Sequence, residues 1–252
     1  MKVGDYEIDI IVQGFPGKSG FHGGLGWSTV ALIRTADRKL MIDGGSFGMR
    51  RIIISRLAER GVKPGDITDM LLTHAHHDHM VNWVLFRQAR IVIGAHELET
   101  SAKLPWGETP SPELYVRELQ SWPTLHTLQD GAEAFPGMTA HMAPGHTRGH
   151  MVFVLHGPEY DVIFTGDAAK NRAELVSRAT DMTYDPSVSA ATINLIWELW
   201  QRRPGSILIP GHDLAMVQAN GSCRYIAKRE ASILAWYGDD METKTQFDLT
   251  AE

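Results

Sequence analysis

Short apolar runs recur along the whole chain and are separated by turn-forming residues. The runs are rich in Val, Ile, Leu and Phe, and each is short enough for a strand but too short for a typical helix. On this basis we predict strands over Tyr6–Val12, Ser28–Arg34, Lys39–Ile42, Ile67–Leu72, Ala89–Ile93, Met138–His141, Met151–Leu155, Val162–Phe164 and Ile207–Ile209.

Other stretches repeat apolar residues every three or four positions, which is the spacing of one face of a helix. The clearest case is Val188–Arg202, where Ser187 is the expected N-cap. The predicted helices cover Met49–Arg60, Ala95–Ala102, Val188–Arg202 and Arg224–Tyr237.

Two segments lack either kind of periodicity. Gly14–Gly26 contains six glycines and one proline, so we expect a flexible loop or an open hairpin tip there. Lys103–Pro112 contains three prolines and is expected to be irregular. No repeat, charge run or composition shift marks a linker, so we expect one α/β domain over residues 1–252.

The composition limits the partners and the compartment. Hydrophobic residues make up 43% of the chain and the net charge is −6, so we expect a well-buried core and no attraction to the phosphates of nucleic acid. Cys223 is the only cysteine, which excludes an internal disulfide and favours a buried thiol. No segment resembles a signal peptide or a membrane span, so we expect a cytoplasmic protein without a membrane partner. The tryptophans, the methionines and Lys103–Pro112 are candidates for a homodimer contact, or equally for covering the core.

Four of the twelve histidines fall within six residues, in the segment Thr73–His79. Residues two apart on an extended chain point the same way, so His74 and His76 can face one point. Asp78 and His79 follow at the turn and can face a second point close by. Imidazole and carboxylate suit divalent zinc, manganese, iron or cobalt, and a plain surface loop has no ordinary use for this composition. The segment therefore predicts a metal site.

Further ligands are expected from strand ends later in the chain. His146, Asp167 and His212 are each preceded by glycine close to a predicted strand. Gly145 and Gly149 would let the backbone turn so that His146 points into a cleft. Such a recurrence is typical of a site that several loops build at one edge of a sheet.

The order His-x-His-x-Asp-His, followed by His, Asp and His, resembles the metallo-β-lactamase superfamily over nearly the whole chain, from the Asp43-Gly44-Gly45 turn onwards. The resemblance implies an α/β fold, a four-layered αββα sandwich, with two divalent metal ions at one edge and a bridging water or hydroxide as the nucleophile. Zinc is the expected metal, and Mn2+, Co2+ and Fe2+ are the alternatives. By position, the resemblance assigns His74, His76 and His146 to the first ion, Asp78, His79 and His212 to the second, and Asp167 to a bridge between them. Asp78 is also the candidate catalytic proton acceptor.

Several neighbouring residues are expected to support this site. Metal-bound histidines need hydrogen-bond partners, and Asp43, Thr73 and His150 are the candidates. His77 is expected to point away from the metals because ligands flank it on both sides. The candidates for substrate contact are Phe21 and His22 in the glycine-rich loop, and Lys170 and Tyr184 after the bridging aspartate.

Within the superfamily the chain is most similar to the N-acyl homoserine lactonase-like group, through Phe86–Ile93, Glu97-Leu98-Glu99 and Gly211-His212-Asp213. The similarity implies a hydrolase that opens a lactone or related ester in a small-molecule substrate. One position departs from the group. Those lactonases usually carry a tyrosine three residues after the bridging aspartate, where this chain has Lys170. Tyr184 is the candidate replacement, from another direction.

Two other reactions remain open. A glyoxalase II-like thioesterase is similar in Gly145–His150 and Phe164–Asp167, but only forty residues follow His212, which is short for the helical region of that family. An iron-dependent oxidoreductase similar to the persulfide dioxygenases would use the same scaffold, and metal analysis would distinguish it. A β-lactamase proper is disfavoured because those enzymes generally lack the bridging aspartate.

Overall fold

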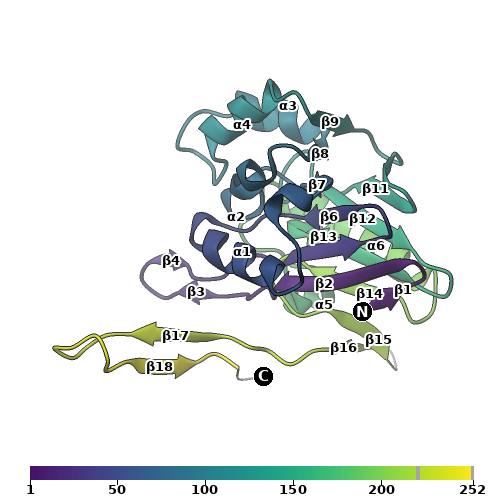
Figure 1. Cartoon of the computed structure of the whole chain (residues 1–252). Helices are drawn as coiled ribbons and strands as arrows, with labels where there is room; N and C mark the ends of the chain where they lie inside the picture. The colour runs from purple at the N-terminus through teal and green to yellow at the C-terminus, as the bar shows by residue number, and fades with distance from the viewer. Residues whose placement is uncertain (220–221, 251–252) are drawn as a thin grey trace.

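The computed structural model describes residues 1–219 and 222–250, and its two largest sheets pack face to face (Figure 1). Each of these sheets has seven strands. The first, in spatial order, contains β1 (Lys2–Val3), β2 (Tyr6–Val12), β5 (Val30–Arg34), β6 (Lys39–Ile42), β7 (Asp69–Leu71), β8 (Arg90–Gly94) and β9 (Leu125–Leu128). The second contains β10 (Glu133–Phe135), β11 (Met138–Met142), β12 (Met151–His156), β13 (Asp161–Gly166), β14 (Ile207–Pro210), β15 (Met216–Ala219) and β16 (Ser222–Tyr225).

Side chains along each strand alternate between the two faces of its sheet. On β12, Phe153 packs in the core between the sheets, whereas Val152 and Val154 pack on the outer face. On β5, Ile33 points inward and Leu32 outward. Successive side chains of a strand point to opposite faces. Each sheet therefore contributes one face to the central core and the other to a layer of helices.

Helices cover both outer faces. The first sheet is covered by α1 (Arg50–Ala58), α3 (Ala95–Lys103) and α4 (Glu113–Gln120), together with the short α2 (His77–Met80) and the 3-10 segment Val81–Phe86. The second sheet is covered by α5 (Arg172–Ser177) and α6 (Pro186–Gln201). The result is an α/β sandwich with four layers, so the predicted αββα fold is confirmed.

The predicted strands are all present, and their ends differ from the prediction by at most two residues. Three of the four predicted helices are present as α1, α3 and α6, and no helix or strand interrupts the irregular segment after Lys103. The predicted N-cap Ser187 is wrong because α6 begins earlier, with Pro186 in its first turn. The side chain of Asp185 accepts the backbone N–H groups of Ser187 and Val188 instead.

The predicted helix over Arg224–Tyr237 is wrong. Its first residues belong to β16, which pairs antiparallel with β15, and its later residues form β17 (Ser232–Ala235), which pairs with β18 (Thr245–Asp248). The apolar residues of this segment have helix-like spacing, but partner strands satisfy the backbone here, and local periodicity carries no information about those partners. Cys223 lies on β16 and is buried, as predicted.

Two small hairpins extend from the sandwich. Part of the glycine-rich segment pairs as β3 (Lys18–Ser19) with β4 (Gly23–Gly24), as the expected hairpin tip. The C-terminal arm, which we define as residues 231–249, contains β17 and β18 and extends away from the body (Figure 1). Among the described residues, no helix has both the length and the apolar character that a membrane crossing requires.

Candidate metal centre

The predicted ligands meet at one edge of the two sheets. The segment Thr73–His79 follows β7, His146 lies in the loop between β11 and β12, Asp167 follows β13, and His212 follows β14. Strands β13 and β14 are parallel neighbours, so their carboxyl ends lie side by side and bring two of these loops together. All seven predicted ligands are in this cluster.

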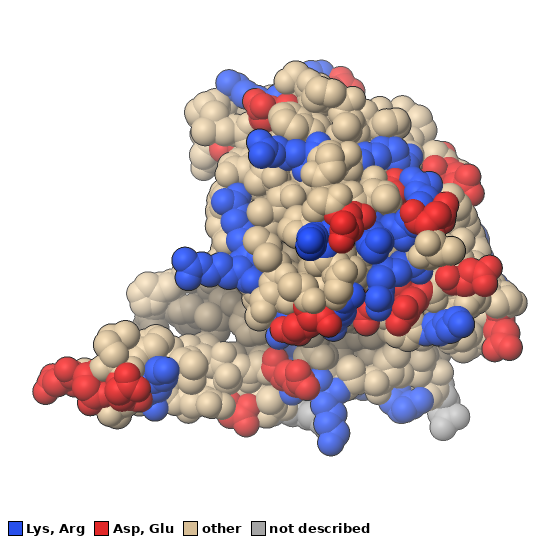
Figure 2. Space-filling view, viewed as in Figure 1, with Lys and Arg blue, Asp and Glu red and all other residues tan. Residues whose placement is uncertain are grey.

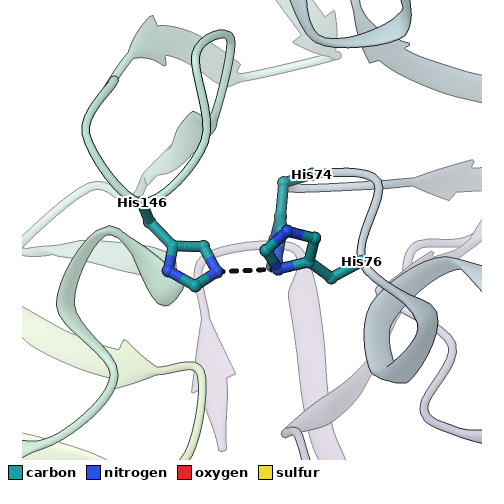
Figure 3. A group of neighbouring side chains, drawn as sticks. All are labelled: His74, His76 and His146. Carbon is teal, nitrogen blue, oxygen red and sulfur yellow. Dashed lines mark hydrogen bonds between the residues drawn. The ribbon is translucent and has the colours of Figure 1, made fainter. Parts of the chain in front are cut away.

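The first group contains His74, His76 and His146, whose ring nitrogens lie within 4.8 Å of one another (Figure 3). His146 Nε2 lies 2.9 Å from His76 Nδ1, the contact drawn dashed in Figure 3. The loop around His146 turns at Gly145, whose φ is +129° and where a side chain would collide with Ser189. This backbone conformation explains why glycine precedes His146, as the sequence suggested.

The second group contains Asp78, His79 and His212, again with one ligand atom from each within 4.8 Å of the others. His212 Nε2 lies 3.2 Å from Asp78 Oδ2 and 3.4 Å from His79 Nε2. His77 belongs to neither group, and its side chain is exposed and lines the cavity described below, so its predicted orientation away from the metals stays a prediction.

Asp167 lies between the two groups, and its two oxygens face different ones. Oδ2 is 3.4 Å from His146 Nε2, whereas Oδ1 is 3.2 Å from the Nε2 atoms of both His79 and His212. A third ligand group of His74, His79 and Asp167 also satisfies the 4.8 Å limit. A single carboxylate that reaches both groups has the geometry of a bridging ligand.

The protonation states suit a metal. Burial lowers the pKa of His74 and His146 well below the ordinary value, and lowers that of His76 to about 4. These rings are therefore neutral, which is the form that coordinates a cation. His74 Nε2 is buried and has no hydrogen-bond partner among the described residues, a costly state for a polar atom that a metal ion would relieve.

Negative charge is concentrated in the second group. Burial opposes ionisation, but the imidazoles of His79 and His212 hold the pKa values of Asp78 and Asp167 well below the ordinary range. Burial alone would lower the pKa of His212, but Asp167 and Asp78 raise it to about 9. A buried carboxylate, Asp167, and a half-buried one, Asp78, form a site that favours positive charge, so the donor set fits divalent cations.

Asp43 orients the ligand loop. Its carboxylate accepts the backbone N–H and the hydroxyl of Thr73, each at 2.8 Å, and lies 2.8 Å from His79 Nδ1. This contact leaves His79 Nε2 directed into the site. His150 Nε2 accepts the backbone N–H of Asp167 at 3.0 Å. The three predicted supporting residues therefore all contact a ligand residue or its loop.

Glu97 is a supporting residue that the sequence did not single out for this role. It is fully buried on α3, and its carboxylate accepts the backbone N–H groups of Ala75 and Gly149 and the hydroxyl of Thr147. It thereby connects the loop of His74 and His76 to the loop of His146. The exposed Glu99 lies two residues later on the same helix, and no local signal distinguishes the two glutamates.

We expect Glu97→Gln to lower the free energy of unfolding by about 2 kcal/mol and zinc affinity by roughly 10–100-fold, because the amide presents a donor where several donors already converge. Urea denaturation and competitive zinc titration measure the two effects. Glu99→Gln is the matched control and should change neither quantity. An unaltered urea midpoint for Glu97→Gln would show that this carboxylate does not hold the two loops together.

A cavity of about 830 Å³ opens over both ligand groups. Lys170 and Tyr184 line it, as predicted for substrate contacts, whereas Phe21 and His22 do not. Phe21 is 96% exposed at the tip of the β3–β4 hairpin, so the prediction that these two residues contact substrate gains no support from their placement. Other parts of the same hairpin, including Lys18, do line the cavity.

The two lining residues are held by neighbours. Lys170 Nζ lies 2.9 Å from Glu174 Oε1 and donates to the carbonyl of Asp181 at 2.7 Å. The guanidinium of Arg148 stacks 4.2 Å from the ring centre of Tyr184. The cavity therefore has an ammonium group and an aromatic ring in defined positions beside the ligand cluster.

Comparison with known proteins agrees with this geometry. The chain is 33% identical over 102 residues to metallo-beta-lactamase domain-containing protein 1 of Rattus norvegicus, covering 39% of this chain and 40% of that protein. It is 24% identical over 175 residues to the N-acyl homoserine lactonase of Bacillus thuringiensis, covering 68% of this chain and 65% of that protein. These matches span less than two thirds of either relative's length. A solved dizinc quorum-quenching lactonase in complex with the product N-hexanoyl-L-homoserine shares the fold, with a TM-score of 0.71, 15% identity, and coverage of 92% of this chain and 97% of that one.

The family model matches the part of the chain that carries every ligand described above. The model of the metallo-beta-lactamase superfamily covers residues 23–212, from the β3–β4 hairpin to the last ligand. This span is more than half of the chain and ends at His212. The chain therefore belongs to the metallo-beta-lactamase superfamily.

Proposed function

We propose that the protein is a dinuclear metal-dependent hydrolase that opens a lactone or related ester. The observation that carries the proposal is the pair of ligand groups with Asp167 between them, one oxygen toward each group. Zn2+ is the first candidate for both ions, and Mn2+, Co2+ and Fe2+ remain alternatives. When bound, a pair of divalent ions lowers the pKa of a water molecule and polarises the carbonyl of the ester.

The chain's own residues provide the rest of the chemistry. Water adds to the carbonyl carbon, the bond from that carbon to the ring oxygen breaks, and the departing oxygen takes up a proton. Asp78 belongs to the second ligand group and its carboxylate lines the cavity, so it can accept the proton from water and return it to the departing oxygen. Lys170 and Tyr184 line the cavity, which supports a role for both in orienting a small substrate.

The lactone is favoured as the substrate by the similarity to the Bacillus thuringiensis N-acyl homoserine lactonase, which extends over 68% of this chain. The volume of the cavity suits a small molecule and its lining mixes charged with apolar groups. Thioester hydrolysis would use the same ligands, and iron-dependent oxidation would use the same scaffold with a single-metal set such as His74, His76 and His146. Both are therefore outcomes of the test below.

The test is a substrate panel on protein purified without chelators, with metal content measured on the same sample. We expect close to two zinc, manganese or cobalt ions per chain and a kcat/KM for lactones that exceeds the values for thioesters and β-lactams. Faster turnover of thioesters would assign the glyoxalase II-like reaction instead. One iron per chain, with oxygen consumption and no ester hydrolysis, would assign the oxidoreductase reaction.

A further inference from the structure

The C-terminal arm has an exposed apolar surface. Its strands β17 and β18 pair only with each other among the described residues, and both strands carry large apolar side chains that face solvent. Tyr237 is 76% exposed and Met241 is 70% exposed. The exposed large apolar residues of the arm are Leu234, Trp236, Tyr237, Met241 and Phe247. Figures 1 and 2 show the arm as a narrow projection at the lower left that reaches beyond the body.

An isolated two-stranded hairpin is at best marginally stable in water, and exposed apolar surface of this kind typically marks an interaction site. The hydrogen bonds and aromatic contacts within the arm are local, such as Trp236 Nε1 to the carbonyl of Met241 and the ring contact between Tyr237 and Phe247. These contacts leave the outer faces of both strands uncovered. A second molecule is therefore needed to cover them.

The arm is also acidic. Residues 231–249 contain four carboxylates, Asp239, Asp240, Glu242 and Asp248, and one basic residue, Lys244, which gives a net charge of −3. Figure 2 shows acidic side chains gathered at the tip of the arm. Two arms placed against each other would therefore repel, which disfavours pairing of arm with arm.

The outer surface of α1 has the complementary character. Residues 47–60 contain four arginines and one glutamate, a net charge of +3. Three of the arginines are half-buried and bonded within the subunit: Arg60 to Asp9 and Glu59, Arg56 to the carbonyl of Ile11, and Arg50 to Asn82. Arg51 is exposed, and within the described part of the chain it is in no ion pair, so it is the charge of this surface that is free for a partner. Within the same stretch the side chains of Phe47, Ile52 and Ile54 are exposed. We call this surface the α1 face. In Figure 1 the arm and the β3–β4 hairpin extend toward the same side of the molecule, with α1 drawn between them and the upper helices.

We propose that the protein is a homodimer in which the arm of each subunit lies on the α1 face of a second copy. Each copy has one arm and one α1 face, so a twofold pair satisfies both surfaces and closes the assembly. The acidic arm meets the basic face, and exposed aromatic side chains meet exposed isoleucines. This inference is independent of the proposed hydrolysis, because the cavity is lined by no residue of the arm or of α1.

The segment just before the arm is bonded to the body, in part through the residue that follows the ligand His212. Arg229 Nη2 donates to Asp213 Oδ1 at 2.5 Å, and Asp213 follows the ligand His212. Gln13 accepts the backbone N–H of Glu230 and donates to the carbonyl of Lys228, each at 3.0 Å. These contacts fix the direction in which the arm leaves the body, so the arm is positioned for a partner before that partner binds.

Sedimentation velocity on the zinc-loaded full chain tests the proposal. We expect the full chain to sediment as a dimer, with twice the chain mass of 28.0 kDa. The chain that ends at Glu230 should sediment as a monomer. Zinc content and melting temperature of the shortened chain establish that its body is folded. A full chain that remains monomeric at 50 µM (roughly the upper end of ordinary assay concentrations) would overturn the dimer, as would a shortened chain that still dimerises.

Reciprocal charge changes test where the arm lies. Arg51→Glu alone and Glu242→Arg alone should each raise the dimer dissociation constant by at least about tenfold, because each places like charges together. The chain with both changes should recover much of the loss. Arg87→Glu, an exposed arginine outside the α1 face, is the control and should have no effect. If the double variant instead loses as much dimer affinity as the two single variants added together, the arm does not lie on the α1 face.

Discussion

Replacement of Asp167 by asparagine should lower hydrolysis by about three orders of magnitude and leave one metal ion or none on each chain. Asp167 directs one oxygen to each ligand group, and the amide nitrogen of asparagine can coordinate neither ion. The loss also removes the negative charge that separates two cations. Metal ions contribute several kcal/mol to the stabilisation of charge in the transition state, and each 1.4 kcal/mol changes a rate by about tenfold.

Elemental analysis and steady-state kinetics on the same preparation measure both effects. Asp181→Asn is the matched control, because Asp181 lines the same cavity but belongs to no ligand group. It should keep the full metal content, with any change confined to KM. An Asp167→Asn protein with two ions and normal turnover would remove the bridging role. A protein with two ions and no turnover would give Asp167 a role in the reaction rather than in metal binding.

The strands were the most predictable part of the fold, because each is a short apolar run between turn residues. The layered arrangement follows from the same runs, since strands that are buried on both faces need a sheet on one side and helices on the other. Helix α4 was not predicted. It begins directly after the proline-rich segment, whose irregular backbone ends at Pro112, the N-cap of the helix. The C-terminal strands were mistaken for a helix because the apolar spacing of 224–237 resembles a helix, whereas its two ends pair with different strands, β15 just before the segment and β18 just after it.

The ligands could be predicted because their types and their order are unusual, and a short sequence pattern carries that information without any structure. The supporting residues differ in this respect. Asp43 was recognisable from its place before two glycines, whereas Glu97 is identical in type to its exposed neighbour Glu99. The burial of Glu97 depends on the loop of Gly149 packing against α3, a contact between segments about fifty residues apart. Such contacts are set by tertiary structure and leave no local pattern.

The substrate contacts were the least predictable. Phe21 and His22 lie in the correct loop, but the β3–β4 turn directs them away from the cavity lining, while Lys18 of the same hairpin lines it. The direction of a side chain in a glycine-rich hairpin depends on its register, and a shift of one residue reverses it. Lys170 lines the cavity because it lies three residues after the ligand Asp167. Tyr184 lines it because its segment contacts another ligand loop: the backbone N–H of Tyr184 donates to the carbonyl of His146.

Removal of the metal ions by a chelator should abolish hydrolysis and lower the melting temperature by roughly 8–16 °C for each site. A ligand present at a thousand times its dissociation constant stabilises the native state by about 4 kcal/mol, and for a chain of this size each 1 kcal/mol shifts the melting temperature by roughly 2–4 °C. The structural reason is the buried cluster itself. Without a cation, His74 Nε2 has no hydrogen-bond partner among the described residues, and the carboxylates of Asp78 and Asp167 lie side by side among imidazoles.

Differential scanning calorimetry of the chelated protein, before and after each metal is added back, measures this effect. Zn2+, Mn2+ and Co2+ should restore both the melting temperature and the activity. Mg2+ is the control and should restore neither, because it prefers oxygen ligands and five of the seven predicted ligands are imidazoles. The Asp167→Asn protein should show a smaller shift on chelation. A melting temperature that chelation leaves unaltered would mean that these histidines hold no metal ion in the native protein, and the hydrolase would then lose its physical basis.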